Sequence, residues 1–238
     1  METAENSVRS EAARLRAAYA RRDQTIPASR YSYFTPSHLY WMQQRERDFL
    51  RTLRQVGWTT LRDKRVLEVG CGDGAVLRSF LSYGAKPENL VGVDLLQDRI
   101  EAARHLAPNI EFHCADATTL PFPDASFHFV CQVTVFTSIL DWQVRRQLAE
   151  EMIRVLTSDG VILWYDFHMD NPSNADVRGV KGREIQALFP DCSIALRRVT
   201  LAPPLMRLIA PYSWLACYGL EKIPFLCTHY IGVITHRM

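Results

Sequence analysis

The sequence predicts an α/β protein with a three-layer, doubly wound sheet of seven strands, mostly parallel and closed by one antiparallel C-terminal strand. Seven short apolar runs suited to buried strands occur between residues 65 and 235. Helical patterns separate most of the earlier runs, and such alternation is typical of βαβ units around a parallel sheet. A chain of 238 residues is also long enough to bury one sizeable core.

The predicted elements follow in order from the spacing of apolar residues and the positions of turn residues. Strands are expected at 65–69, 90–93, 111–114, 127–132, 161–166, 192–201 and 228–235. Helices are expected near 75–81, 97–106, 143–155 and 184–188.

The first 60 residues are expected to form a helical cap, and residues 61–238 the sheet domain. Residues 7–22 are alanine-rich and charged, which is typical of a helix or a frayed arm. An aromatic turn follows at 31–36. Ser37 is then the expected N-cap of a second helix that carries an apolar stripe.

An apolar stretch at about residues 203–227 is inserted between the last two strands. From Leu201 to Leu220 the only charged residue is Arg207, and three prolines interrupt the segment. The prolines argue against a membrane-spanning helix. We expect the insertion to roof an acceptor pocket or to meet a second subunit in a homodimer. Association with a membrane surface ranks third.

Composition excludes several classes of partner. A formal net charge of +2 without a basic run gives no reason to expect nucleic acid. The six cysteines form no C-x-x-C pair, and no His, Cys or Asp grouping has the spacing of metal ligands. Residues 1–25 lack the apolar core of a secretory signal. Reduced thiols in a cytoplasmic protein are therefore expected.

A glycine-rich turn is the most informative segment for function. The apolar run Val66–Val69 leads directly into Gly70-Cys71-Gly72-Asp73-Gly74, and a helix opens at Ala75. Glycines let the backbone turn sharply and lie against a ligand. A nucleotide-like cofactor at the carboxyl end of a first strand is the usual reason for this arrangement.

Two cofactors compete for the turn. Gly70, Gly72 and Ala75 satisfy the pattern G-x-G-x-x-G/A, so NAD has to be considered. A dinucleotide places its pyrophosphate on the helix N-terminus, where Glu68 and Asp73 would repel it. S-adenosylmethionine has no phosphate and carries two cationic groups that carboxylates attract. The acidic turn therefore favours S-adenosylmethionine.

Two further carboxylates stand at the ends of the next strands. Asp94 follows the second strand, about 20 residues after the turn, where an acid can accept hydrogen bonds from a ribose diol. Asp116 follows the third strand and could meet the adenine amino group. With Glu68, these residues place a carboxylate at or near three successive strand ends.

The chain resembles the class I S-adenosylmethionine-dependent methyltransferases of the small-molecule type, which have a Rossmann-like sheet. Four segments carry the resemblance: V-L-E-V-G-C-G-D-G, V-G-V-D-L, C-A-D-A-T-T-L-P-F-P-D-A-S-F and R-V-L-T-S-D-G-V-I-L. It implies that the methionine part lies near the glycine turn, the ribose near Asp94 and the adenine near Asp116. The expected cofactor-binding residues are Glu68, Gly70, Cys71, Gly72, Asp94, Leu95, Asp116, Ala117, Gln132 and Tyr33.

Candidates for the chemistry follow the fifth strand. His168 could remove a proton from a hydroxyl acceptor near neutral pH, or it could be a solvated loop histidine. Asp166 could act as base, orient a histidine or cap the loop backbone. Arg178 could hold an anionic group of the substrate, although basic loops such as this one are more often solvated.

The predicted activity is transfer of a methyl group from S-adenosylmethionine to the hydroxyl of a small molecule or glycan-pathway intermediate. Such transfer depends mainly on holding donor and acceptor in contact. A C-methyltransferase acting on a lipid quinone or polyketide is the alternative that the apolar insertion would suit. A non-catalytic cofactor-sensing module and an NAD-dependent reductase are further alternatives.

Overall fold

The computed structural model describes residues 2–237 and contains a seven-stranded sheet of order β3-β2-β1-β4-β5-β7-β6. β7 runs antiparallel to both of its neighbours, and the pairs among β1 to β5 are parallel. This confirms the predicted fold class. The strands are β1 Val66–Val69, β2 Leu90–Asp94, β3 Glu111–Cys114, β4 Phe127–Val133, β5 Leu156–Phe167, β6 Cys192–Leu201 and β7 Cys227–His236.

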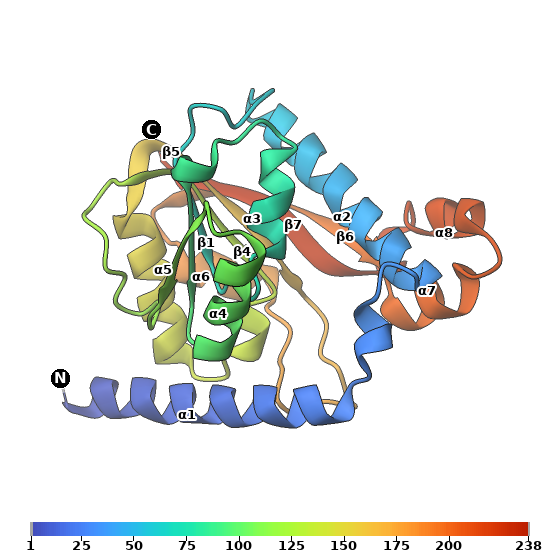
Figure 1. Ribbon diagram of the computed structural model, residues 1–238, viewed down its shortest axis with the longest axis horizontal. Helices are drawn as coiled ribbons and strands as arrows, with labels where there is room; N and C mark the ends of the chain where they lie inside the picture. Colours follow the sequence, from blue (N-terminus) through green and yellow to red (C-terminus); the bar gives the residue numbers. More distant parts are fainter. Residues whose placement is uncertain (1, 238) are drawn as a thin grey trace.

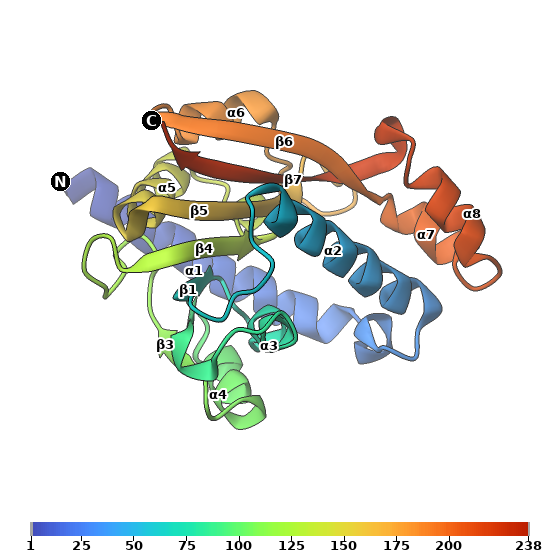
Figure 2. The same ribbon diagram turned by 90° about the horizontal axis from the view of Figure 1, so that it is seen from above.

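Helices cover both faces of the sheet and make the three layers visible in Figure 2. On one face, Phe49, Leu77 and Ile100 anchor α2, α3 and α4 in a shared core. On the other face, Leu148 and Ile185 anchor α5 and α6. The α-helices are α1 Glu2–Thr25, α2 Pro36–Gln55, α3 Ala75–Leu81, α4 Gln97–Leu106, α5 Trp142–Arg154, α6 Gly182–Leu188, α7 Pro203–Ile209 and α8 Trp214–Leu220.

The central strands are apolar on both sides because both faces are covered. All four residues of β1 are buried. Leu67 and Val69 enter the core beneath α5, whereas Val66 enters the core beneath α3. A continuous apolar run is the expected signature of such a strand. The register places the end of β1 between β2 and β4, so the glycine turn opens at the middle of the sheet.

Two sequence predictions need correction. Ser37 is not an N-cap, because α2 begins at Pro36 and Thr35 is the capping residue. Proline suits the first turn of a helix, where its missing N–H would have no partner. β5 begins at Leu156 rather than near 161, because a register shift lets Leu156 pair with Phe127 before the regular ladder starts.

The segment between β6 and β7 contains α7, α8 and the short turn η4, Pro224–Leu226. Figure 1 shows α7 and α8 projecting beyond the end of the sheet, where they meet the N-terminal half of α2. Met206, Cys217 and Tyr40 form a small separate core there. No helix within residues 2–237 combines the length and apolar character needed to cross a bilayer.

Candidate cofactor and acceptor site

The turn after β1 adopts the backbone conformation that its glycines permit. Gly70, Gly72 and Gly74 all have positive φ, at 67°, 54° and 75°. A Cβ on Gly70 would lie 2.4 Å from a methyl carbon of Val135, and one on Gly74 would strike the Phe112 ring at 2.7 Å. Side chains at these two positions would collide with the structure as well as strain the backbone.

Gly72 differs from the other two because the space beside it is open. A Cβ there would meet only Nη1 of Arg99, at 3.9 Å. The Cys71 N–H donates to Val93 O at 3.0 Å and ties the turn to β2. A ligand can therefore approach the backbone at Gly72 while the rest of the turn is fixed.

Asp94 organises the same edge of the sheet. Its Oδ2 accepts the Gly72 N–H at 2.8 Å, and its Oδ1 accepts the Leu96 N–H at 2.9 Å. The carboxylate thus joins the glycine turn to the start of α4. Asp94 and the adjoining Leu95 are both partly exposed, so remaining lone pairs of the carboxylate can accept from a ligand.

Two buried polar atoms beside the turn have no hydrogen-bond partner. Glu68 is 2% exposed and its Oε2 is unpaired, while Gln132 is fully buried with an unpaired Nε2. Burial raises the pKa of Glu68 well above its usual value. An unpaired buried polar atom costs about 1–3 kcal/mol, which a ligand that supplies the missing partner would recover.

Asp116 and Ala117 lie after β3, both partly exposed. Asp116 Oδ1 accepts from the backbone and hydroxyl of Thr118, at 2.9 and 2.7 Å. Its Oδ2 makes no hydrogen bond among residues 6–237. Because β1, β2 and β3 are parallel neighbours, the predicted carboxylates lie together at the carboxyl ends of these strands.

These features fit S-adenosylmethionine. The buried Glu68 offers an acceptor to a cation, Gln132 offers a donor, and Gly72 leaves room for a ligand. Sequence reasoning missed Arg99, which stands beside Gly72 but pairs with Asp23 at 3.6 Å. Within the described chain, no group of three or more His, Cys, Asp or Glu side chains could hold a metal ion.

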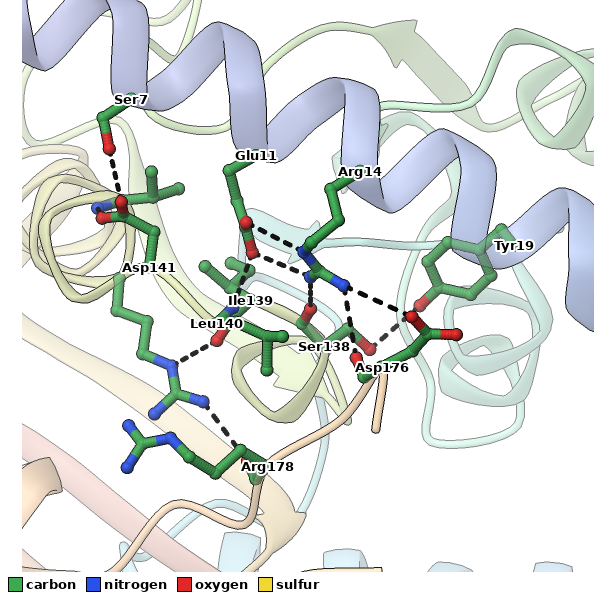
Figure 3. Close-up of polar contacts among 12 residues, drawn as sticks. Ser7, Glu11, Arg14, Tyr19, Ser138, Ile139, Leu140, Asp141, Asp176 and Arg178 are labelled. Carbon is green, nitrogen blue, oxygen red and sulfur yellow. Dashed lines mark hydrogen bonds and ion pairs between the residues drawn. The ribbon is translucent and has the colours of Figure 1, made fainter. Parts of the chain in front are cut away.

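Helix α1 crosses the same edge of the sheet, along the lower side of Figure 1. Figure 3 shows its polar contacts with the loop that follows β4. Glu11 Oε1 accepts the Leu140 N–H at 2.6 Å, Arg14 donates to Ser138 O, and Ser7 donates to Asp141. The N-terminal helix is therefore docked on the loop and is not a free arm.

The C-terminal half of α1 reaches the cofactor turn. Tyr19 shares a hydrogen bond with the Ser138 hydroxyl at 3.2 Å, and its ring lies 4.5 Å from the guanidinium carbon of Arg99. Since Arg99 is the neighbour of Gly72, Tyr19 joins the loop after β4 to the glycine turn. Sequence reasoning missed Glu11, Arg14 and Tyr19, because their partners lie more than 100 residues away.

Asp166 is fully buried beneath the same loop. It accepts the Thr137 N–H at 3.1 Å, the Thr137 hydroxyl, and the Phe167 N–H at 2.8 Å. Burial raises the pKa of Asp166 to about 6. Of the roles weighed for this residue, the contacts favour capping the loop backbone. Beside it the buried Arg145 donates to Ile139 O at 2.6 Å.

His168 lies just after β5 and is 9% exposed. Its Nε2 is 2.9 Å from Cys227 O, so that nitrogen carries the proton and Nδ1 keeps the lone pair. Burial lowers the pKa of His168, which keeps the imidazole neutral near pH 7. A neutral ring oriented by a carbonyl can accept a proton, although the aromatic ring of Tyr230 packs against it at 4.5 Å.

Arg178 and Tyr33 make contacts with their own neighbours. Arg178 donates to Glu184 Oε1 at 2.7 Å, and its own carbonyl accepts from Arg145. This pairing favours the solvated-loop interpretation over an anion site. Tyr33 is 60% exposed and meets His38 edge-on at 5.7 Å, so it packs on the start of α2.

Aromatic side chains cluster around the C-terminal end of β5, where Tyr165 and His229 are fully buried. Trp41 donates to the Tyr165 hydroxyl at 3.0 Å, and His229 stacks on the Tyr165 ring at 4.8 Å. Phe167 lies 3.8 Å from the same imidazole. Thr200, which bonds the Tyr165 hydroxyl at 2.7 Å, has a positive φ of 67°. Such strain is concentrated at ligand sites.

Comparison with known proteins places these residues in context. Residues 66–160 match the family model described as a methyltransferase domain. The chain is 34% identical over 137 residues to a phthiotriol/phenolphthiotriol dimycocerosates methyltransferase of Mycobacterium ulcerans. The aligned region covers 53% of this chain and 49% of that protein. It is 38% identical over 105 residues to a fatty-acid O-methyltransferase of Mycolicibacterium smegmatis, with 43% and 37% covered. The chain thus spans about half the length, or less, of these curated relatives.

Solved structures share the architecture. A SAM-dependent methyltransferase from Archaeoglobus fulgidus matches with a TM-score of 0.57 and 16% identity, over 85% of this chain and 99% of that one. At this level of identity the likeness concerns the fold, and function has to be argued from the site.

Proposed function

Since this chain belongs to the class I methyltransferase family, we propose that it transfers the methyl group of S-adenosylmethionine to an oxygen of an apolar small molecule. The observation that carries the proposal is the pair of unpartnered buried atoms, Glu68 Oε2 and Gln132 Nε2, beside a glycine turn that is open at Gly72. A donor with a cationic amino acid end and no phosphate satisfies both atoms.

The chain's own residues would divide the work of binding. Glu68 and Gln132 would hold the methionine end, Asp94 the ribose and Asp116 the adenine amino group. The bound cofactor supplies an electrophilic methyl group on a sulfonium. The protein's task is then to fix the acceptor oxygen against that carbon and to exclude water, which accounts for most of the rate in such displacements.

The acceptor end supports an apolar substrate. Trp41 and Phe167 are partly exposed aromatic residues near the end of β5, and the buried Tyr165 holds Trp41 in place through its hydroxyl. The named relatives, a phthiotriol dimycocerosates methyltransferase and a fatty-acid O-methyltransferase, act on lipids by their names. A hydroxyl acceptor would lose its proton to His168. The Nδ1 atom of this residue keeps its lone pair, because Nε2 carries the proton that is donated to Cys227 O.

The test is incubation of the purified protein with methyl-labelled S-adenosylmethionine and a lipid extract, followed by product mass spectrometry. We expect label on an ester or ether oxygen of an apolar product. A labelled methyl group attached to a carbon of the product would show C-methylation and contradict transfer to oxygen. Calorimetry with NAD is run in parallel, because the Arg99 cation beside Gly72 could also attract the pyrophosphate of a dinucleotide. Micromolar NAD affinity without a response to S-adenosylmethionine would overturn the assignment.

A further inference from the structure

The outer face of the insertion carries large apolar side chains that no described residue covers. Leu208 is 68% exposed, Tyr212 88%, Leu215 81% and Phe225 74%. All four lie in α7, α8 or the turns beside them, which project from the end of the molecule in Figures 1 and 2. Scattered apolar side chains are ordinary, but four large exposed ones on the single segment that projects from the sheet indicate an interaction surface.

The charges around the tip have one sign. Between residues 202 and 226 the only acid is Glu221, whose side chain is 5% exposed and bonded to Tyr40 and Arg47. Arg207 is exposed and makes no ion pair within residues 6–237. The surface therefore presents aromatic and aliphatic groups with cations and without a free carboxylate.

The basic character continues along α2. A hollow on this helix is lined by Arg47, Leu50, Arg51, Arg54 and Gln55. Arg51 and Arg54 are exposed and make no ion pair with any described residue.

The hollow adjoins helix α8 of the insertion, and no acid lines it. The Arg47 guanidinium lies 5.7 Å from the Tyr218 ring centroid, which joins the hollow to α8. Of the two acids of α2, Asp48 binds Arg197, and Glu46 is exposed but is not among the residues that line the hollow.

We propose that the tip of the insertion, Leu208, Tyr212, Leu215 and Phe225, docks on an anionic phospholipid bilayer, with Arg51, Arg54 and Arg207 at its headgroups. Apolar groups that enter the acyl boundary beside basic groups are the pattern of proteins that lie on a membrane. A second copy of this chain fits the charge less well, because a symmetric contact would bring the same cations together. Docking does not depend on methyl transfer.

The docking surface adjoins the acceptor end of the site. Tyr40 of α2 packs edge-on against Trp214 of α8 at 5.7 Å, and the next residue, Trp41, bonds Tyr165. A bilayer held at the tip would therefore lie next to the aromatic edge, and an apolar acceptor could pass from one to the other without crossing water.

Vesicle flotation tests the proposal. The wild-type chain should float with vesicles of phosphatidylcholine and phosphatidylglycerol, and flotation should fall in high salt and on pure phosphatidylcholine. The variant Leu208→Ser/Tyr212→Ser/Leu215→Ser should bind at least tenfold more weakly. Leu106→Ser is the matched control, because this residue is a 53% exposed leucine on α4 at the other edge of the sheet; it should float like wild type.

A charge variant tests the proposal with substitutions of exposed residues, which leave the buried core of the insertion unchanged. Arg51→Gln/Arg54→Gln/Arg207→Gln removes three exposed cations, each worth about a fivefold attraction, so binding should fall roughly 100-fold. Wild-type protein that ignores anionic vesicles would overturn the proposal. So would a dimer in light scattering that the serine variant converts to monomer, because the face would then belong to a second copy.

Discussion

The Glu11 carboxylate accepts the backbone N–H of Leu140 at 2.6 Å, across 129 residues of sequence. Burial alone would raise the pKa of Glu11, but hydrogen bonds from Arg14 and Leu140 outweigh it and lower the pKa. The loop after β4 is consequently held from two sides, by α1 on one and by Asp166 and Arg145 on the other. Gln132 lies in β4 just before this loop and accepts the Val135 N–H at 3.1 Å, so its side chain is tied to the start of the loop.

Loss of the Glu11 contact should release the loop. In Glu11→Ala we expect faster amide hydrogen exchange at residues 137–141 and weaker cofactor binding, because a hydrogen bond to a charged group contributes about 1.5–3 kcal/mol. Exchange mass spectrometry and calorimetry measure the two effects. The control is Arg16→Ala, an exposed residue of the same helix. Equal exchange in both variants would mean that α1 does not restrain the loop.

Asp94→Ala should weaken S-adenosylmethionine binding by about 1–3 kcal/mol, because it removes the partner of Gly72 and the proposed acceptor for the ribose hydroxyls. Asp94→Asn keeps one oxygen for the Gly72 N–H and should lose less. Asp98→Ala, an exposed acid in the first turn of α4, serves as control. Unchanged affinity in Asp94→Ala, measured by calorimetry, would remove this residue from the ribose site.

His168→Asn should lower turnover by roughly 10²-fold at pH 7 while leaving cofactor affinity intact, as expected for a general base. In the wild type, kcat should rise with pH through a pKa below 6.5 and then level off, since burial lowers the pKa of this imidazole. The variant should lose that limb. His105→Ala, an exposed histidine on α4, controls for surface effects. An unchanged pH profile would mean that no base is needed.

His229 should make the fold sensitive to acid. Burial, then the charges of His168 and Arg45, lowers the pKa of His229 to about 3. In the unfolded chain His229 binds a proton near pH 6.5, whereas in the folded chain it stays neutral until about pH 3. The free energy of unfolding should therefore fall from pH 6.5 toward pH 3, by up to about 1.4 kcal/mol per pH unit.

Comparison with His229→Phe isolates this effect. Asp166 acts in the opposite sense, because its raised pKa of about 6 favours the folded state as pH falls from 6 toward 3.8. The difference between wild type and variant, measured by denaturant unfolding from pH 7 to 4, contains only the His229 contribution. Parallel curves for the two proteins would contradict the assignment.

Local pattern was enough to predict most of the sheet. The helices at 75–81 and 97–106 and the strands at 111–114 and 192–201 have the predicted bounds. Each is marked by the spacing of its apolar residues or by the turn residues beside it, so the signal lies within the element or directly next to it. The glycine turn and Asp94 belong to the same category, since parallel strand ends meet at one edge.

Long-range contacts could not be predicted in this way. Glu11 and Arg14 form an i, i+3 pair that is typical of any solvated helix, and nothing in their neighbourhood indicates Leu140 or Ser138. Asp166 sits at a strand end, as a catalytic acid would, but Thr137 binds it from a different loop. Such partners depend on how loops settle against one another after the sheet has formed.

The insertion leaves and rejoins the sheet at a single point. Leu201 pairs with Cys227, and the Ala202 N–H donates to Leu226 O at 2.8 Å, so the two ends of the segment are adjacent. Lengthening or replacing a segment whose ends already meet costs little loop entropy. Residues 203–225 could therefore be replaced in related chains without a change in the seven-stranded sheet. Such chains could acquire new acceptors or new docking partners through this segment alone.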